Sequence, residues 1–319
     1  MNLRQLRSLC EVVDRGLRIS EAAQAMFRSQ PSVSRQMQEL EAELGIPIFR
    51  RKRNRVLELT PQGREVLAIA RRIVNDIDNL GRLGKEFAQG NSGEFAIATT
   101  HTQARYTLPD VVERFQSAYP NVRLSLRQGT PAQCCELVQR RQADLAICTE
   151  TSRGHEELVQ LACYRLNRSV VTPKGHPLLR AKPLTLQAIA RYPVITYDEG
   201  FSGRAIVDQA FAEKSLKPSV VLSAIDADVS KTYVEKGLGI AILATVAFDA
   251  KRDANLRCLD ARHLFPPSRL NVVVRRDVYL RGFMIEFIRL FAPALRKADL
   301  EQFLAGEDAA PVRSNLPEL

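Results

Sequence analysis

The stretch that decides the fold is residues 19–45, ISEAAQAMFRSQPSVSRQMQELEAELG, which predicts two short helices joined by a tight turn. Ser20 is the expected N-cap of the first helix. The second helix is expected to begin at Gln30 or the residue before it, with Pro31 in its first turn, and to stop at Gly45. Spacings of four, three and four give this second helix one buried stripe, formed by Val33, Met37, Leu40 and Leu44.

The opposite face of the second helix is polar where the helix begins. At about 100° per residue, the residues turned away from the stripe are Pro31, Arg35, Gln38 and Ala42, with Ser34 on the flank. Arginine can pair with guanine, while serine and glutamine can reach base edges or phosphate oxygens. The helix is therefore a candidate reader of the DNA major groove through Gln30, Ser32, Ser34 and Arg35. The alternative is a helical hairpin whose polar face is merely solvated.

Residues 46–59, IPIFRRKRNRVLEL, predict two short strands around a strongly basic tip. Only Asn54 is uncharged between Arg50 and Arg55. Such charge density on a tight hairpin is typical of a wing that follows the phosphate backbone beside a helix-turn-helix. A solvated run of charge is the alternative, but the run follows the candidate recognition helix directly. The wing side chains expected to contact DNA are Arg50, Arg51 and Arg53.

These segments together resemble the amino-terminal module of LysR-type transcriptional regulators. The resemblance rests on residues 3–15, the ISEAA opening, SQPSVSRQMQELEAELG, IFRRKRNRVLELTPQG and the long helix predicted after it, and it covers the chain end to end. It implies a winged module that binds double-stranded promoter DNA and a carboxy-terminal domain that senses a small-molecule inducer. It also implies assembly into a homotetramer and contact with RNA polymerase.

Composition agrees with a partner that carries many negative charges. The chain has 319 residues, which suits two or three domains, and a net charge of +10 with a pI near 9.5. The charge excess is concentrated at the amino terminus: residues 1–90 hold 16 Lys and Arg against 11 Asp and Glu, whereas residues 91–319 hold 30 against 25. The first part thus carries the same excess on well under half the length.

Cysteine usage and hydropathy predict a cytoplasmic protein without membrane contact. The six cysteines show no C-x-x-C spacing and no paired metal-ligand pattern, so no metal site and a reduced state are expected. Redox sensing through Cys134 and Cys135 stays open beside the commoner role of small buried hydrophobes. The amino terminus has no apolar core suited to a signal peptide, and no run approaches the roughly 18 apolar residues of a membrane span.

Thr60-Pro61 predicts the start of a helix that can run to about Ala88, on the order of 40 Å at 1.5 Å per residue. Its apolar residues alternate by four and three, as in a heptad seam: Val66, Ala70, Ile73, Ile77, Leu80, Gly84 and Phe87. A seam on an isolated helix needs a partner, so this helix is expected to form a homodimer. The alternative is that the stripe packs on the chain's own carboxy-terminal domain.

Beyond the QGNSG linker at residues 89–93, strands and helices alternate in the pattern of a parallel α/β sheet. Two such sets joined by paired crossings predict two lobes around a cleft, as in type 2 periplasmic binding proteins. The expected fold is thus a multidomain α/β protein: a winged helix-turn-helix at 1–59, a linker and dimerisation helix at 60–90, a two-lobed effector-binding domain at 91–305, and a disordered tail at 306–319. Lobe I is expected at 91–163 and 268–305, and lobe II at 164–267.

Three hydroxyl-rich turns are expected to face the cleft, because ligands in open α/β sheets lie outside the carboxyl ends of strands. These turns are residues 99–103, 148–150 and 200–203. Neutral hydroxyls and backbone amides suit a small oxyanion or a polar zwitterion. Each turn alone could be ordinary helix capping, so the prediction depends on the three occurring together.

The same turns carry a closer resemblance, to the CysB branch of the LysR-type regulators, which controls sulfur assimilation. The matching motifs are TTHTQARY at 99–106, DLAICTE at 144–150, GFSGR at 200–204 and DADVSKTYVEKGLGIAI at 226–242. The resemblance implies a sulfate or acetylserine-like effector held by Thr100, Thr102, Gln103, Thr149, Tyr164 and Ser202. Ser202 and Leu166 depart from the branch pattern, as do Ser32 and Arg35 in the recognition helix. A paralogue with a related regulon is therefore also open.

An enzyme is not expected, because each catalytic motif is incomplete. His155-Glu156 lacks the second histidine of a zinc helix, and residues 200–203 fall one residue short of the G-x-S-x-G turn. Gly237 and Gly239 lack the third glycine of a dinucleotide loop, so no cofactor is expected. His101 is the one histidine near the expected cleft. Two alternatives stay open: a LysR-type regulator of another pathway that senses a small carboxylate, and a cytosolic ligand-binding protein.

Overall fold

The computed structural model describes residues 1–52, 55–89, 91–150, 157–276, 278–305 and 316–319. The chain divides into two compact units, Met1–Ala88 and Gln89–Leu319, which are described separately. Arg53, His155 and Glu156, all considered above, lie outside the described residues.

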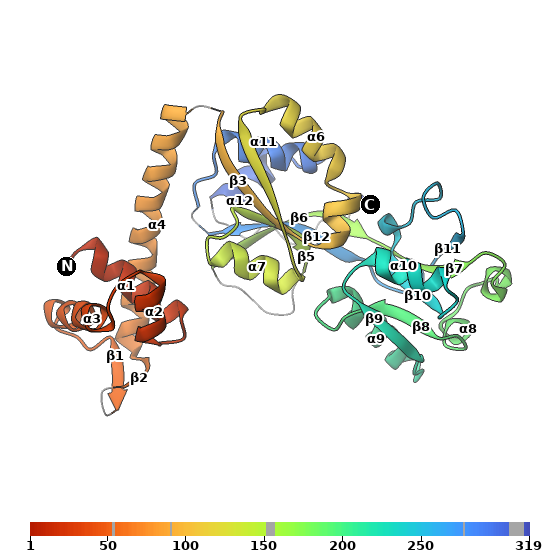
Figure 1. Cartoon of the computed structure of the whole chain (residues 1–319), viewed down its shortest axis with the longest axis horizontal. Helices are drawn as coiled ribbons and strands as arrows, with labels where there is room; N and C mark the ends of the chain where they lie inside the picture. Colours follow the sequence, from red (N-terminus) through yellow and green to blue (C-terminus); the bar gives the residue numbers. More distant parts are fainter. Residues whose placement is uncertain (53–54, 90, 151–156, 277, 306–315) are drawn as a thin grey trace. The chain divides into compact units, whose positions relative to one another are not determined.

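The first unit is a helix-turn-helix followed by a hairpin and a long helix (Figure 1). Its elements are α1 (Leu3–Asp14), α2 (Ile19–Ala25), α3 (Gln30–Leu44), β1 (Phe49–Lys52), β2 (Arg55–Leu59) and α4 (Pro61–Gln89). The predicted bounds of α3 are confirmed, and Gly45 ends it with a φ of +70°, which glycine adopts at low cost. The prediction that Ser20 caps α2 is wrong, because the helix begins at Ile19 with Arg18 at the cap position.

The predicted stripe of α3 forms the centre of this unit's core. Val33, Met37 and Leu40 are fully buried, and Leu44 packs against their cluster. The hairpin closes against the start of α4 at Gly63, where an added Cβ would lie 2.1 Å from the carbonyl oxygen of Ile48. A side chain cannot fit there, so Gly63 fixes how closely the hairpin approaches α4.

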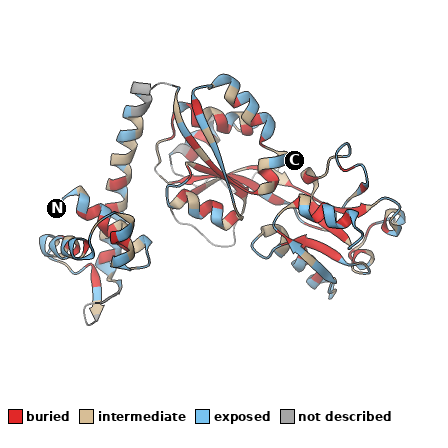
Figure 2. Cartoon of the chain, in the orientation of Figure 1, coloured by how far each residue is buried: buried red, intermediate tan, exposed pale blue. Residues whose placement is uncertain are grey.

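The predicted seam of α4 divides into two parts. Its amino-terminal part is used inside the unit, since Ala70 is buried in the core and Val66 and Ile73 pack against it. Its later part is not covered within the unit, since the later described turns of α4 are coloured intermediate or exposed (Figure 2). Leu80 is 67% exposed and Phe87 is 83% exposed. Only the later part is therefore free to meet a partner.

Lobe I of the second unit is a five-stranded sheet in the order β4-β3-β5-β12-β6. The strands are β3 (Gly93–Thr99), β4 (Val122–Gln128), β5 (Leu145–Thr149), β6 (Leu158–Leu166) and β12 (Ser268–Arg275). The helices are α5 (His101–Tyr106), α6 (Pro109–Ala118), α7 (Pro131–Gln139), α11 (Gly282–Phe291) and α12 (Lys297–Leu304). The expected return of the chain to this lobe is confirmed, because Phe287 of α11 packs edge-on against Phe95 of β3 at 5.4 Å.

Lobe II is a second five-stranded sheet, in the order β11-β7-β10-β8-β9. Its strands are β7 (Arg168–Pro173), β8 (Val194–Tyr197), β9 (Val220–Ala224), β10 (Ile240–Ala244) and β11 (Leu256–Asp260). Its helices are η1 (Pro177–Arg180), α8 (Leu186–Ile189), α9 (Ser202–Glu213), α10 (Ala227–Glu235) and η2 (Thr245–Ala247).

Both sheets are mixed, so the expectation of parallel sheets is correct only in part. β3 runs parallel to β4 and β5, but β12 is antiparallel to both β5 and β6. In lobe II, β8 runs parallel to β9 and β10, whereas β7 is antiparallel to β10 and β11. The antiparallel strands are those beside the crossings, where the chain leaves one lobe and enters the other. The first crossing lies at Asn167, three residues beyond the expected boundary.

The carboxy terminus differs from the predicted disordered tail at its last four residues. Leu316 is buried, and the chain beside it pairs with β6: the N–H of Arg165 donates to Pro317 O at 2.8 Å, and the N–H of Leu319 donates to Arg165 O at 3.0 Å. Glu318 adds ion pairs to Arg165 and Arg262. Residues 306–315 lie outside the described part of the chain. Within the described part, no helix has the length and hydropathy needed to cross a bilayer.

Candidate DNA-binding and effector sites

The candidate base-reading residues all lie in the first two turns of α3. Gln30, Ser32 and Arg35 are exposed, and Ser34 is half-buried on the flank. Arg35 is 81% exposed, and its Nε donates to Glu39 Oε1 at 2.8 Å, an i,i+4 pair that leaves the guanidinium on the helix surface. The four residues therefore begin one helix and three of them are exposed, and their contact with DNA stays a prediction.

Two of the wing arginines, Arg50 and Arg51, have different surroundings. Arg50 is exposed and forms an ion pair with Glu58 across the hairpin at 2.7 Å. Arg51 instead donates from Nη2 to Glu41 Oε2 of α3 at 2.7 Å, with both side chains mostly covered. Glu41 Oε1 also accepts the backbone N–H groups of Ile48 and Phe49, at 2.9 Å each. Arg51 therefore holds the hairpin against the recognition helix, a role that its place in a basic run did not indicate.

Phe27 is a residue that the sequence pattern did not single out. It lies in the turn between α2 and α3 with a φ of +54° and is 97% exposed. An aromatic ring on a helix-turn-helix turn, outside the apolar period of both helices, is the one signal that could have marked it. Its ring is an exposed apolar surface in the turn that leads into α3.

In lobe I, the candidate effector residues gather at the start of α5. Thr100 is the N-cap of α5, yet its side chain makes no capping hydrogen bond. Ordinary helix capping was the alternative role for Thr100, and the absence of a capping bond does not support it. Thr102 and Gln103 are buried, and Gln103 Oε1 accepts from Thr107 Oγ1 at 2.8 Å. Thr99 lies within β3 and donates to Ile147 O at 2.8 Å, so it serves the sheet.

The second and third hydroxyl turns meet directly. Ser202 Oγ of lobe II donates to Thr149 Oγ1 of lobe I at 2.9 Å. Thr149 ends β5, and Ser202 is the first residue of α9, whose cap position makes no side-chain hydrogen bond. One contact thus joins the carboxyl end of a strand in one lobe to the amino terminus of a helix in the other, where free N–H groups favour an anion.

Tyr164 is not brought to this group. Its hydroxyl donates to Phe291 O at 2.5 Å, and its ring packs edge-on against Phe291 at 5.4 Å, so it contacts α11. Leu166, expected to alter the pocket, is buried in the lobe I core. Tyr164 and Leu166 are two residues apart on β6, so both point to the face of the strand that packs on the core. Placing Tyr164 with the other effector residues therefore does not agree with the structure.

A second polar group joins the lobes through α5 and α10. The hydroxyl of Tyr106 donates to Asp228 Oδ1 at 2.5 Å and accepts from Lys231 Nζ at 2.8 Å. Lys231 also donates to Asp253 Oδ2 and to Ala247 O, each at 2.9 Å. Arg105 Nε lies 2.6 Å from Asp228 Oδ2. The helix that presents Thr100 and Thr102 therefore also carries the contacts to lobe II.

His101, Asp226 and Asp228 place possible metal-ligand atoms within 4.8 Å of one another. The two carboxylates are already in use, however. Asp226 caps α10 by accepting the N–H of Val229 at 2.8 Å, and Asp228 is paired with Arg105 and Tyr106. The group fits a set of lobe-to-lobe contacts better than a metal site.

Arg168 and Tyr197 are buried polar residues beside the Thr149–Ser202 contact that the motifs did not indicate. An added Cβ on Gly203, in the first turn of α9, would lie 3.5 Å from Arg168 Nη2 and 3.5 Å from the ring of Tyr197. Burial lowers the pKa of Arg168 to about 10 and raises the pKa of Tyr197. An arginine at the start of a buried strand, Arg168 before SVV, is the sequence signal that could have drawn attention to it.

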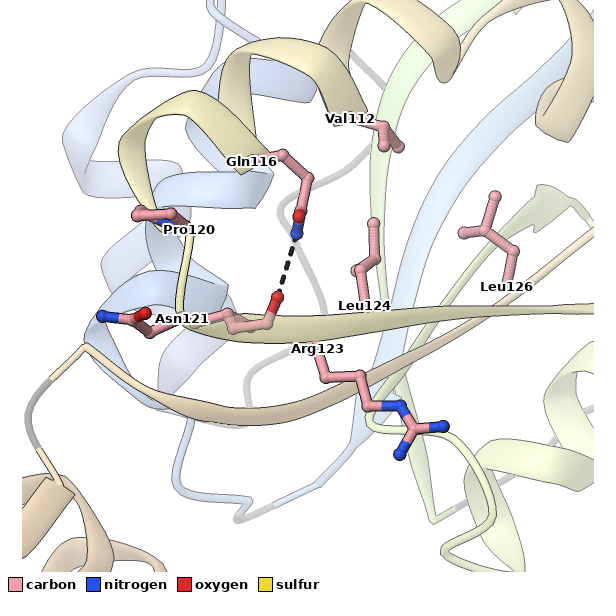
Figure 3. A pocket seen from close by; sticks show the side chains of 8 residues that line it. Val112, Gln116, Pro120, Asn121, Arg123, Leu124 and Leu126 are labelled. Carbon is pink, nitrogen blue, oxygen red and sulfur yellow. Dashed lines mark hydrogen bonds between the residues drawn. The ribbon is translucent and has the colours of Figure 1, made fainter.

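A separate groove lies on the outer edge of lobe I, between α6 and β4 (Figure 3). Its floor includes Leu124 and Leu126, and Gln116 Nε2 donates to Val122 O at 2.9 Å across one end. None of the candidate effector residues lines it. The groove is therefore a surface feature of edge strand β4 and is distinct from the candidate effector site described above.

Comparison with known proteins gives two family matches that together cover most of the chain. The model of the bacterial regulatory helix-turn-helix protein, lysR family, matches residues 3–64, and the LysR substrate binding domain matches residues 88–296. The chain is 46% identical over 307 residues to the HTH-type transcriptional regulator CysB of Burkholderia cenocepacia, covering 96% of this chain and 98% of that protein. It is 44% identical over 304 residues to the regulator SsuR of the same organism, covering 95% and 99%.

A solved structure agrees with these matches. The cofactor-binding domain of the Cbl transcriptional regulator is 41% identical, with a TM-score of 0.64, and the match covers 68% of this chain and 95% of that domain. Family model, identity and fold lead to one assignment: the chain belongs to the LysR family of transcriptional regulators, in the group that contains CysB, SsuR and Cbl.

Proposed function

We propose that this regulator binds promoter DNA through α3 and its wing, and that a small sulfur-containing anion, such as sulfate or an acetylserine-like inducer, controls it from the second unit. It acts in the cytoplasm, where it reaches the DNA. It controls transcription through contact with RNA polymerase. The genes it controls serve sulfur assimilation or the use of organosulfur compounds, which the likeness to CysB and SsuR supports.

One observation carries the effector part of this proposal: the 2.9 Å contact between Ser202 and Thr149. It joins the carboxyl end of β5 in lobe I to the amino terminus of α9 in lobe II. Thr100, whose side chain makes no capping hydrogen bond, and the buried Thr102 belong to the helix that follows the neighbouring strand β3. Hydroxyl donors and helix N–H groups recognise an anion through hydrogen bonds directed at its oxygen atoms. Gln103 completes the set, whereas Tyr164 is left out of it.

Replacing one donor tests the site. Thr100→Val keeps the shape of the side chain but removes a donor to a charged ligand, which costs on the order of 1.5–3 kcal/mol. Titration calorimetry with the full chain should then show sulfate-class affinity lower by roughly ten-fold to a hundred-fold. Ser117→Ala, which removes an exposed hydroxyl from α6, is the control and should leave affinity unchanged. Unchanged sulfate affinity in Thr100→Val would remove the residue from the site.

A gel-shift with genomic fragments tests the DNA part and separates the alternatives. Retarded, salt-sensitive fragments upstream of sulfur-related genes are expected. A chain that binds no fragment would be a cytosolic ligand-binding protein. A chain that binds fragments from another pathway and responds to a small carboxylate would be a LysR-type regulator outside the sulfur branch.

The proposed assembly is a homodimer through α4 that pairs into a homotetramer. The exposed later seam of α4, with Leu80 and Phe87, supports the dimer. A second contact is supported by an exposed apolar surface on lobe II, along edge strand β9 and helix α10, formed by Val220, Val221, Ile225, Val229, Tyr233 and Leu238. Single exposed apolar residues are common, but six on adjoining elements indicate an interaction surface.

A further inference from the structure

Arg168 places a buried positive charge where the two lobes join. It is the first residue of β7 and is 5% exposed. Its Nη1 donates to Pro266 O at 2.6 Å, and its Nη2 donates to Ser268 Oγ at 2.5 Å. The guanidinium lies beneath the first turn of α9, since an added Cβ on Gly203 would be 3.5 Å from Nη2.

In the described part of the chain no carboxylate forms a direct ion pair with this guanidinium, although Glu150 offsets part of its charge from farther away. A guanidinium has five N–H donors, and the described residues accept from Nη1 and Nη2 through one neutral carbonyl and one neutral hydroxyl only. Glu150 acts on Arg168 through its charge and raises its pKa, but burial, the larger effect, lowers it. Keeping an arginine charged without a paired carboxylate is costly in a covered site. An anionic ligand would offset that cost.

Tyr197 gives a second and independent indication of a ligand. It ends β8, is 8% exposed, and its hydroxyl is buried without a hydrogen-bond partner. The nearby Thr102 hydroxyl and the backbone of Ala244 both lower the pKa of Tyr197 against the larger raising effect of burial, although neither reaches hydrogen-bond geometry with its hydroxyl. The hydroxyl of Tyr197 is therefore close to a candidate effector residue of the other lobe. A buried hydroxyl without a hydrogen-bond partner is costly, so a bound ligand that accepts a hydrogen bond from it would account for its position.

We propose that Arg168 and Tyr197 form the floor of the effector site and that this site selects tetrahedral oxyanions by their net negative charge. The inference rests on the proposed function and deepens it. The hydroxyls of Thr100, Thr149 and Ser202 supply shape and hydrogen bonds but no charge. Arg168 supplies the charge, and the amino terminus of α9 adds to the positive potential at the same place. The site thus prefers a dianion over a monoanion, and a monoanion over a neutral or zwitterionic molecule of similar size.

Three ligands that share a tetrahedral sulfonyl group but differ in charge test the selection: sulfate, methanesulfonate and dimethyl sulfone. Calorimetric titration of the full-length parent should give affinities in that order, with sulfate at least about ten-fold tighter than dimethyl sulfone. The methanesulfonate arm also separates free sulfate from an organic sulfonate as the source of the oxyanion. A parent that binds dimethyl sulfone as tightly as sulfate overturns the inference, and so does a parent that binds none of the three.

Variants of Arg168 and Tyr197 test which of the two residues produces the preference for charged ligands. Arg168→Met should lose sulfate affinity by at least about ten-fold and should bind the three ligands almost equally, whereas Arg168→Lys should keep the order. Tyr197→Phe removes only an unpaired hydroxyl, so it should fold like the parent and lose sulfate affinity by roughly three-fold to ten-fold. Tyr192→Phe, whose ring packs against His176 in lobe II, is the matched control and should bind like the parent.

The outcomes separate this inference from the proposed function. In one outcome, Thr100→Val loses sulfate binding, whereas folded Arg168→Met and Tyr197→Phe keep the affinity and the ligand order of the parent. That outcome would support the effector site and would overturn the role of its floor. Parental binding in Thr100→Val and a flattened ligand order in Arg168→Met would support the floor and remove the Thr100 contact. If Arg168→Met does not fold, the sulfate affinity of Tyr197→Phe and the ligand order of the parent decide the question.

Discussion

Arg51 and Arg50 are neighbours of the same type, yet the structure gives them different tasks. The ion pair of Arg51 with Glu41 has side-chain exposures of 24% and 16%, whereas the pair of Arg50 with Glu58 has 67% and 56%. Arg51→Ala leaves a partly buried carboxylate without its cation and should lower the free energy of unfolding by about 1–2 kcal/mol. Arg50→Ala, the matched control, should change it by less than about 0.5 kcal/mol. Denaturant unfolding measures both, and equal losses would contradict the different tasks.

Arg35 is expected to read a base, because it is the exposed guanidinium at the start of the recognition helix. Arg35→Ala should cost about 1–3 kcal/mol on the specific site and should reduce the preference for that site over random DNA. Glu39→Gln is the control: it removes the carboxylate that holds Arg35 Nε at 2.8 Å, and it should bind DNA at least as tightly as the parent. Gel-shift titrations on both DNAs decide this. Equal weakening on specific and random DNA would make Arg35 a phosphate contact.

Among the elements, α5 joins the effector residues to lobe II. The Tyr106 hydroxyl bonds both Asp228 and Lys231 of α10, while Thr102 lies on the same six-residue helix and Thr100 is its N-cap. Tyr106→Phe keeps the ring and removes both bonds, at about 0.5–1.5 kcal/mol each. The expected results are a several-fold loss of effector affinity and faster amide exchange in α10 without effector, read by hydrogen exchange. Ser117→Ala, on α6, is the control, because it removes one exposed hydroxyl that donates to Glu113 O within its own helix. Parental exchange in Tyr106→Phe would show that α5 does not link the lobes.

The elements that the sequence predicted well are those with a strong period. The stripe from Val33 to Leu44 placed α3, and the alternation of strands and helices placed most of both lobes. The sequence could not place Arg51, because its partner Glu41 is ten residues away and both belong to surfaces that look equally charged. Arg168 and Tyr197 were missed for a similar reason, since their neighbour Gly203 is remote from Arg168 in sequence. Tyr164 was misplaced because a motif gives a residue's position in the chain but not the side of the strand on which it lies.

At the scale of the whole molecule, the division of the α4 seam changes how dimer formation should be tested. Ile73 packs against the core of the first unit, Met1–Ala88, so a charge at that position would disturb folding as well as association. Leu80 and Phe87 are exposed within the single chain, at 67% and 83%, so charges there should leave the first unit intact. They also lie seven residues apart, one heptad, and therefore on the same face of the helix.

Leu80→Asp combined with Phe87→Asp should therefore abolish the dimer without unfolding the chain, because an apolar interface cannot solvate four carboxylates, two from each copy. Sedimentation velocity should show the shift to a smaller species, and gel-shift affinity for a two-half-site operator should fall, since two-fold symmetry is what places two recognition helices on it. Ala68→Asp, which adds a charge to the same helix off the seam, is the matched control and should sediment like the parent. If the double variant kept the parental sedimentation coefficient while the circular dichroism of all three proteins agreed, the subunits would associate through another surface, and the exposed apolar residues of β9 and α10 would be the next to substitute.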